Sequence, residues 1–531
     1  MTVDMAFKDA ASKMWDQLTH VRVNSLNGKC TTLPILTLRN KYSRSFHLSW
    51  FGFWVAFLAW FAFSPLVPEA VKTDLHLSAA EVGNSNIVSL CATLLVRVVA
   101  GPLVDRYGPR QVMAWLLILG AIPSGLAGTV HNAHGLYIVR FFIGILGGTF
   151  VPCQAWTTAF FDKHIVGRAN ALAGGWGNSG GGFTFIIMVA LYNRLRSDGL
   201  SQHSAWRAAF AIVPVPVLLL TAATILIFGD DHPYGRWQDR YKAPVAQLQP
   251  PVASGTAPHD RDTERGEVVE QKVEVVLEEK KDSSSAKPEG GSSASEKGPS
   301  NIDVQVMLAQ EGIVITDVDK AVNQKLTWDI ARDALLNPLT WLPALAYMTT
   351  FGFELTIDAS LANVLFGLYT GPNFGQTKAG YIASIYGLLN VVSRPLGGYF
   401  GDLIYKRFGV PGKKYLTLAC GVLQGVFSIG LGVYIDHHDK PKLSVVIVIF
   451  VIVATFNEVA NGANFSLVPH CNPNSNGFMT GIVGAMGNLG GVFYALVFRF
   501  QASPFGKAFW ICGILTMAVN FMLVPIPVPR Q

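Results

Sequence analysis

Apolar runs of about twenty residues recur along this 531-residue chain, separated by short polar segments. The first run, residues 46–67, reads FHLSWFGFWVAFLAWFAFSPLV and contains no Asp, Glu, Lys or Arg. A helix of roughly 20 apolar residues crosses the hydrocarbon core of a bilayer, so each run predicts a membrane-spanning helix in contact with lipid. The predicted spans are 46–67, 84–104, 111–129, 133–155, 169–191, 205–228, 337–362, 376–403, 413–435, 442–466, 477–500 and 506–527.

One long polar stretch divides these runs into two sets of six. It is rich in Glu, Lys, Ser, Gly and Pro and cannot bury a core, which predicts a disordered loop. Its serines and acidic residues suit regulatory phosphorylation, although a passive linker is the favoured interpretation. The predicted fold is therefore an all-α membrane protein with twelve transmembrane helices in two pseudo-symmetric six-helix bundles. The predicted divisions are an N-terminal tail (1–45), a first bundle (46–229), a central loop (230–335), a second bundle (336–528) and a C-terminal tail (529–531).

The composition agrees with a membrane protein and argues against several other classes. Half of the residues are hydrophobic and 14% are charged, which excludes an ordinary soluble protein. The formal charge of +6 is modest and indicates no nucleic-acid partner. The six cysteines lack metal-ligand spacing and are interpreted as small apolar residues. We expect no cofactor and no metal, and no nucleophile–base set among the spans points to an enzyme.

The distribution of Lys and Arg predicts the orientation. Basic residues are enriched in cytoplasmic loops, and they are most frequent if both termini and the 230–335 loop are cytoplasmic. The cytoplasmic face then carries Arg39, Lys41, Arg44, Arg106, Arg110, Lys163, Arg168, Lys406, Arg407, Lys413 and Lys414. The opposite face carries fewer, among them Lys72, Arg194, Arg196, Lys440 and Lys442.

A repeated pattern of arginine, glycine and aspartate relates the two halves. In each copy the three residues are spaced four apart, and the same offset pairs Gly83 with Gly380. Four aligned positions indicate a duplicated half-molecule. The two copies are Arg97, Gly101 and Asp105, and Arg394, Gly398 and Asp402.

The two arginines are the first candidates for chemistry. Eight residues, or about 12 Å of helix, separate Arg97 from Asp105, which places Arg97 near mid-membrane if Asp105 lies at the cytoplasmic mouth; Arg394 follows by the same reasoning. A central Arg costs about 2.5–3.5 kcal/mol on insertion scales, so an anion or a carboxylate has to compensate it. An anion is favoured over a structural salt bridge because the pair is symmetric and neither helix has an acidic residue at that depth. The flat guanidinium fork matches a carboxylate, nitrate or nitrite.

Two glycine-rich strings also correspond between the halves. One is AGGWGNSGGG, residues 173–182, and the other is GIVGAMGNLGG, residues 481–491. Small residues at this spacing let helices approach closely in lipid, whereas the buried amides of Asn178 and Asn488 can donate to an anion. The glycines assigned to these signatures are Gly175, Gly177, Gly180, Gly181, Gly487, Gly490 and Gly491.

With these residues the chain resembles the nitrate/nitrite porters of the major facilitator superfamily. The segment GPLVDRYGPR, residues 101–110, is similar to the superfamily's loop motif between helices 2 and 3, and the two strings are similar to the family's paired nitrate signatures on helices 5 and 11. The resemblance covers all twelve helices, and the long central loop is similar to that of the fungal high-affinity nitrate transporters. It assigns gating to Gly101, Asp105, Arg106, Gly108, Arg110 and Asp402.

The resemblance also implies roles around the substrate. Arg97 and Arg394 match the arginines that clamp the anion, and Asn178 matches a helix-5 asparagine that contacts it. In helix 7, Tyr347 resembles a tyrosine that hydrogen-bonds substrate. The aromatic residues implied to line the site are Phe57, Phe150 and Phe351, each with core packing as the alternative.

Four further ionisable residues lie inside predicted spans: Arg140, Glu354, Asp358 and Glu458. The family is described as coupling anion uptake to protons, so a buried carboxylate would be useful. We expect Arg140 and Glu458 to neutralise each other across the bundle. The sequence does not identify the proton-carrying residue.

The predicted function is import of nitrate, nitrite or both across the plasma membrane by alternating access, with protons as the coupling ion. Without an anion two facing guanidinium groups would repel each other, so occlusion would favour the loaded site. The alternatives are another small anion such as formate, or a nitrate sensor of the same fold. Accumulation of nitrate in liposomes distinguishes a transporter from a sensor.

Overall fold

The computed structural model describes residues 12, 15–24, 27–162, 165–241, 327–471, 476–501 and 505–529. Within this part of the chain nearly every ordered element is a helix, and β structure is limited to isolated bridges. The first half contains α2 (Lys41–Trp60), η1 (Val67–Val71), α3 (Lys72–Asp74), α4 (Ala79–Tyr107), α5 (Pro109–Gly125), η2 (Leu126–Thr129), α6 (Ala133–Ile143), η3 (Gly144–Thr149), α7 (Phe150–Phe160), α8 (Val166–Asn178), α9 (Gly180–Ser197), α10 (Gln202–Ile212), α11 (Pro214–Phe228) and η4 (Trp237–Tyr241). The second half contains α15 (Trp328–Leu336), α16 (Pro338–Tyr369), α17 (Gln376–Asp436), α18 (Leu443–Cys471), α19 (Asn476–Phe500) and α20 (Gly506–Leu523).

These helices correspond to the twelve predicted spans. Nine helices of the described chain are long and apolar enough to cross a membrane. One of them, α17, is two spans joined at Gly409, whose φ of 63° is non-helical. Adding α2 and the α8–α9 pair gives twelve, so the predicted all-α fold class is confirmed.

Local signals explain where individual helices begin and break. Before α4, Ser78 and Glu81 form a capping box that satisfies the first backbone N–H groups. At its other end Gly108 adopts a φ of 91°, which favours glycine, and α5 follows at once with Pro109 in its first position. The first glycine-rich string interrupts its helix at Ser179, between α8 and α9.

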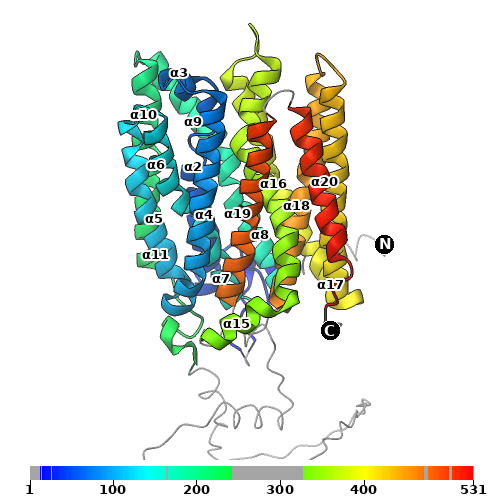
Figure 1. Cartoon of the computed structure of the whole chain (residues 1–531). Helices are drawn as coiled ribbons and strands as arrows, with labels where there is room; N and C mark the ends of the chain where they lie inside the picture. The colour runs from blue at the N-terminus through cyan, green and yellow to red at the C-terminus, as the bar shows by residue number, and fades with distance from the viewer. Residues whose placement is uncertain are drawn as a thin grey trace, which may run out of the picture. The chain divides into compact units, whose positions relative to one another are not determined.

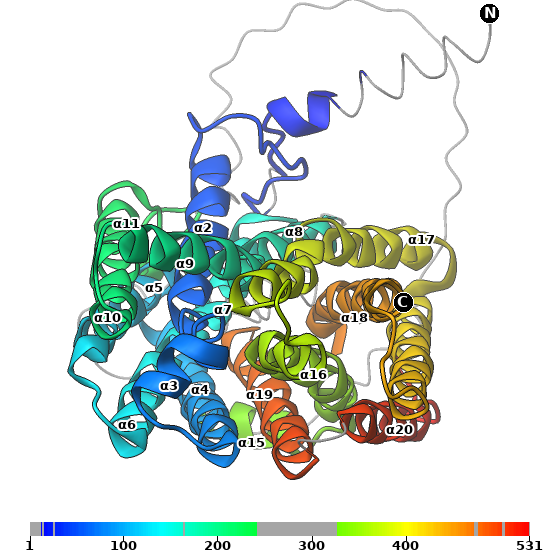
Figure 2. The same cartoon turned by 90° about the horizontal axis from the view of Figure 1, so that it is seen from above.

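The two sets of helices occupy opposite sides of the bundle (Figures 1 and 2). They meet along two seams, where α4 packs on α19 and where α8 and α9 pack on α17. Glycines bring the backbones into contact at both seams. A Cβ added at Gly101 would lie 3.0 Å from the carbonyl oxygen of Gly477, and one added at Gly182 would lie 2.6 Å from the backbone nitrogen of Leu388.

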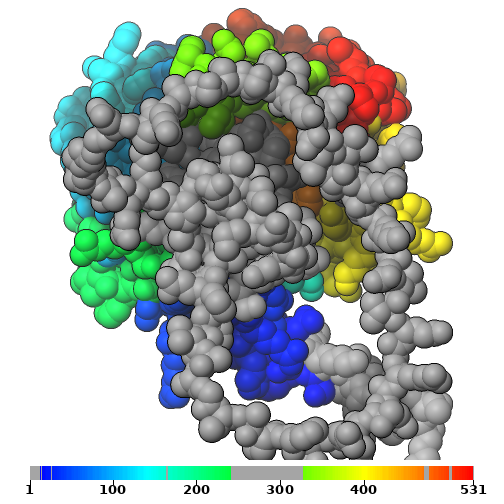
Figure 3. All heavy atoms as spheres, turned by 90° about the horizontal axis from the view of Figure 1, so that it is seen from below, coloured from blue at the N-terminus to red at the C-terminus, as the bar shows by residue number. Residues whose placement is uncertain are grey.

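One end of the bundle, here called the Asp105 end, collects chain segments from several regions. The indole of Trp237 donates to the backbone oxygen of Asp105 (3.0 Å), and Cys30 of the N-terminal segment pairs with Phe161. Figure 3 views the molecule from below, with the N-terminal residues in blue. The predicted central loop, 230–335, is helical near both of its ends, where it forms η4 and α15. Residues 242–326 lie outside the described part.

The halves also meet at the opposite end, here called the Glu69 end. The side-chain oxygen of Gln376 accepts hydrogen bonds from the backbone N–H groups of Glu69 (2.8 Å) and Ala70 (2.9 Å). Nearby, Arg499 Nε donates to Asn84 Oδ1 (3.2 Å). Contacts between the halves at both ends leave the middle of the bundle enclosed.

Candidate functional site: a buried arginine pair

Arg97 points from α4 into the middle of the bundle and is 0% exposed. Its Nε donates to the carbonyl oxygen of Gly147 (2.8 Å) and its Nη1 to that of Gly484 (2.9 Å), so the guanidinium joins the two halves. A Cβ at Gly484 would lie 3.2 Å from Arg97 Cδ, so glycine leaves room for the side chain. Among the described residues its Nη2 is buried without a hydrogen-bond partner. An unpaired charged donor in a low-dielectric interior is costly, which makes it a site for an acceptor from outside the chain.

Arg394 projects from α17 and is 1% exposed. Its Nη2 donates to the hydroxyl of Tyr347 (2.8 Å) on α16, and its Nη1 to Asn390 Oδ1 (3.5 Å). The same Nη1 lies 3.7 Å from Glu354 Oε2. Arg394 therefore has a carboxylate partner, from α16, which the sequence analysis did not foresee.

Phe150 and Phe351 bring the two arginines to one place. Their rings stack with centroids 6.0 Å apart. The Arg97 Cζ lies 4.9 Å from each ring centroid, and the Arg394 Cζ lies 5.8 Å from Phe150 and 5.6 Å from Phe351. Tyr347 stacks on Phe351 at 4.6 Å. Cation–π contacts contribute about 2 kcal/mol or more each when desolvated, so the rings help to hold both charges in the apolar interior.

Three asparagine amides surround Glu354. Asn178 and Asn390 (2.9 Å) donate to its Oε1, and Asn461 (2.7 Å) donates to its Oε2. Asn178, expected to contact the anion, thus bonds a carboxylate beside the arginine pair, and its own Oδ1 is buried without a partner. These bonds fix the carboxyl group that faces Arg394.

The signature glycines fit the helices around this site. A Cβ at Gly175 would lie 2.5 Å from the backbone oxygen of Asn390, and one at Gly487 would lie 2.8 Å from Tyr347 and from Phe351. At three other signature glycines an added Cβ would lie even closer to its neighbour: at Gly177 to Phe53, at Gly180 to the backbone of Trp54, and at Gly490 to the backbone of Met348. Gly181 and Gly491 have only ordinary van der Waals contacts.

The aspartates of the repeat close the Asp105 end in a matching way. Asp105, on α4, accepts from the backbone N–H of Phe478 (3.1 Å) at the start of α19. Asp402, on α17, accepts from the backbone N–H of Arg168 (3.0 Å) at the start of α8. Each half thus places a carboxylate at a helix N-terminus of the other half, where the helix dipole favours negative charge. Lys413 also binds Asp402 (3.1 Å).

The remaining motif residues lie beside this closure. Arg110 pairs with Asp231 (3.3 Å) and therefore holds the segment after α11. Arg106 is exposed and lies over the ring of Tyr107. Gly108, with its positive φ, packs under Trp237.

Known proteins resemble the chain over almost its whole length. The model of the Major Facilitator Superfamily matches residues 49–356 and 342–531. High affinity nitrate transporter 2.5 of Arabidopsis thaliana is 30% identical over 94% of this chain and 82% of its own length. Nitrate/nitrite transporter NrtP of Nostoc punctiforme is 27% identical over 90% of this chain and 91% of its own.

The chain belongs to the nitrate/nitrite porter family of the major facilitator superfamily. This porter is accordingly an integral membrane transporter and not an enzyme. Its fold is also that of the proton:xylose symporter XylE, whose structure aligns with a TM-score of 0.61 at 14% identity, covering 92% of this chain and 97% of that one.

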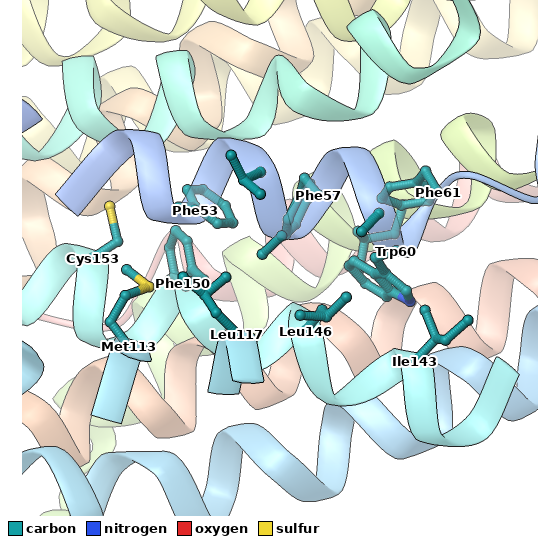
Figure 4. Close-up of a cluster of buried hydrophobic side chains, with 14 of the residues drawn as sticks. Phe53, Phe57, Trp60, Phe61, Met113, Leu117, Ile143, Leu146, Phe150 and Cys153 are labelled. Atoms are coloured by element: carbon teal, nitrogen blue, oxygen red, sulfur yellow. The ribbon is translucent and has the colours of Figure 1, made fainter. Parts of the chain in front are cut away.

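Besides Asn178, two predicted site residues of the porter form no hydrogen bond or cation–π contact with either guanidinium within the described residues. Asn488 donates to the backbone oxygen of Gly484 (3.0 Å) in its own helix. Phe57 lies in an aromatic row of α2, edge-on to Phe53 at 4.4 Å, and Phe53 in turn lies 5.5 Å from Phe150 (Figure 4). The sequence analysis missed Phe53, although it lies one helical turn before Phe57 and therefore on the same face.

The expected pairing of Arg140 with Glu458 is wrong. Arg140 donates to Ser85 Oγ (2.7 Å) and to Asn86 Oδ1 (2.6 Å) of α4. Glu458 instead lies beside Glu354, close to the arginine pair. The sequence identifies both residues as ionisable positions within predicted spans, but the spacing along the chain does not show which helices are neighbours.

Proposed function

We propose that this porter imports nitrate, nitrite or both across the plasma membrane, with one anion held between Arg97 and Arg394. The observation that carries the proposal is the buried Arg97 Nη2 without an acceptor, in a guanidinium that shares the Phe150–Phe351 ring pair with Arg394. A flat oxyanion can accept from a guanidinium fork in bidentate fashion. The relatives described above are a nitrate transporter and a nitrate/nitrite transporter, which supports nitrate and nitrite as the substrates.

The charge of the site supports a single monovalent anion. Two guanidinium groups and the Glu354 carboxylate, if ionised, leave one net positive charge. One nitrate or nitrite would neutralise it. This modifies the expectation that two bare arginines repel each other, because Glu354 already compensates Arg394. A sugar would leave the charge unbalanced.

The arrangement supports alternating access by rocking of the two halves. The arginine pair lies between seams that are closed toward both ends, and each end carries polar bonds between the halves that can break separately. The Asp105 end carries basic residues such as Arg110, Arg168 and Lys413, which supports a cytoplasmic location for it and for both chain termini. Protons are the proposed coupling ion.

Uptake into proteoliposomes tests the proposal. Arg97→Lys keeps the charge but loses the fork, and loss of a charge-assisted hydrogen bond of about 1.5–3 kcal/mol predicts a 10- to 150-fold higher apparent KM for labelled nitrate or nitrite. Arg140→Lys is the matched control, because Arg140 is an equally buried arginine that bonds α4 and not the site; its KM should stay within about threefold of wild type.

The same experiment separates the alternatives. Unchanged affinity in Arg97→Lys would contradict the anion clamp. Binding of nitrate without accumulation in the vesicles would indicate a sensor. Accumulation of formate but neither nitrogen oxyanion would identify a different substrate.

A further inference from the structure

Three carboxyl groups lie together beside the arginine pair, and only one of them has an ion-pair partner within the described residues. Glu354 and Asp358 are on α16 and Glu458 is on α18. All three are buried, with exposures between 0% and 2%. Glu354 is paired with Arg394, whereas both oxygens of Asp358 and both oxygens of Glu458 are buried with no hydrogen-bond donor in the part of the chain that the structure describes.

The groups around these carboxyls do not supply the missing charges. Asp358 Oδ2 faces Gly181 of α9, which has no side chain: a Cβ there would lie 3.5 Å from the carboxyl oxygen. Besides the three carboxyls themselves, the titratable and charged groups that act on the cluster are Arg97 from α4, Tyr347 from α16, and Tyr386 and Arg394 from α17. The hydroxyl of Tyr386 has no hydrogen-bond partner either.

A contact within the cluster requires a proton. The carboxyl groups of Glu354 and Glu458 are close enough to act on one another. Ionised carboxylates only accept hydrogen bonds, so one of the two has to be protonated to donate. Two carboxylates at this separation cannot both remain ionised in a buried site.

The summed charge of the region gives the number of protons. Two arginines and three ionised carboxylates carry one net negative charge, and one bound nitrate makes this two. Neutrality of the loaded site therefore needs two protons, and two carboxyls, Asp358 and Glu458, are without an ion-pair partner. A buried site of low dielectric favours the neutral combination.

We propose that Asp358 and Glu458 are the proton-binding residues of this porter, coupled to the anion through Glu354 and Arg394. This rests on the function proposed above. Protons bind to the two carboxylates from the outer side, anion and protons cross together, and the same protons leave on the inner side when the anion departs. Anion binding strengthens proton binding and, by reciprocity, protons strengthen anion binding.

Nitrate binding to purified wild-type protein across pH provides the first test. The dissociation constant should fall as the pH is lowered, by up to about tenfold per pH unit for each proton taken up. A dissociation constant that does not change between pH 5.5 and 8.5 would overturn the inference without needing any variant, and would leave the anion site itself intact.

Transport by Asp358→Asn and Glu458→Gln provides the second test. Both variants should lose accumulation driven by a pH gradient, by at least tenfold, while exchange of external for internal nitrate continues, since exchange requires binding and rocking but no net proton movement. Glu81→Gln is the control: it removes one carboxylate but keeps the hydrogen-bonding pattern of the capping box, and gradient-driven accumulation should persist.

The failures of the two proposals are distinguishable. A wild-type protein that neither exchanges nor accumulates nitrate or nitrite contradicts the proposed function. Exchange-competent Asp358→Asn and Glu458→Gln variants that still respond to the pH gradient contradict only the assignment of the protons. Accumulation by the wild-type protein that depends on a sodium gradient and not on the pH gradient also contradicts the assignment of the protons.

Discussion

Asp105→Asn tests whether the carboxylate at the Asp105 end holds the halves together. The side chain accepts from the backbone N–H of Phe478 (3.1 Å), the first turn of α19 in the other half. Asparagine retains an oxygen acceptor but removes the charge. The bonds that Trp237 and Arg240 donate to Asp105 go to its backbone oxygen and should be retained.

The expected magnitude follows from two terms. A negative charge at a helix N-terminus contributes about 0.3–1 kcal/mol. Replacing a charge-assisted hydrogen bond by a neutral one costs about 1 kcal/mol. Closure at this end should therefore weaken by about 1–2 kcal/mol, which corresponds to a five- to thirtyfold larger open fraction.

Thiol labelling of Cys153 measures that fraction. Cys153 is fully buried on α7, between Phe150 of the arginine site and Phe160 near the Asp105 end. In a variant that keeps Cys153 as its one cysteine, the labelling rate with a small maleimide should rise five- to thirtyfold on Asp105→Asn. Nitrate affinity should change far less, because the substituted side chain does not contact the arginine pair.

Asp198→Asn is a suitable control. Asp198 is an exposed aspartate directly after α9, and its one ion pair within the described residues is with Arg194 of that helix (3.2 Å), so the labelling rate should not change. A wild-type labelling rate in Asp105→Asn would refute the proposed role of the carboxylate. An equal increase in the labelling rate of Asp198→Asn would also refute this role, because it would indicate that loss of any surface carboxylate loosens the whole bundle.

Two further outcomes concern stability. A Cβ at Gly490 would lie 1.8 Å from the backbone oxygen of Met348, whereas one at the adjacent Gly491 would make ordinary contacts at 3.4 Å. Gly490→Ala should therefore lower the melting temperature in detergent clearly, and Gly491→Ala should lower it little. Equal effects of the two substitutions would contradict the close packing of α16 on α19. Burial, together with nearby Lys29, Arg240 and Lys41, lowers the pKa of His232 from 6.5 to about 3. The unfolded chain therefore takes up the proton first, and stability should fall by about 1.4 kcal/mol per pH unit between pH 6.5 and about pH 3. The melting temperature of His232→Asn should depend less on pH over that range, and an identical dependence would show that His232 does not stay neutral.

Signals that lie along a single helix could be predicted from the sequence. The spans follow from runs of apolar residues, and the depths of Arg97 and Arg394 follow from their distance to the aspartates. The repeat relates the two halves, so a residue in one half suggests its counterpart in the other. The closure at the Asp105 end is an example, because Asp105 and Asp402 each accept a hydrogen bond from a backbone N–H of the other half.

Contacts that depend on helix rotation and neighbourhood could not be predicted in this way. Glu354 lies one turn beyond Phe351 on α16, and only the packing of α16 on α17 shows that it reaches Arg394. For the same reason Arg140 was paired with the wrong partner. The acceptors for Arg97 are backbone carbonyls of Gly147 and Gly484, and no side-chain pattern marks a backbone acceptor.

The glycine contacts between the halves have a consequence for motion. At Gly101 against Gly477, Gly481 against the backbone of Arg97, and Gly182 against Leu388, backbone meets backbone with no side chain between. Interdigitated side chains would have to change rotamers in every transport cycle. Backbone surfaces without side chains between them can instead move past one another at an unchanged distance. In the rocking motion proposed above, these backbone contacts could shift without any side chain changing rotamer, so we expect the polar contacts at the two ends and the charges between them to contribute most of the energetic barrier.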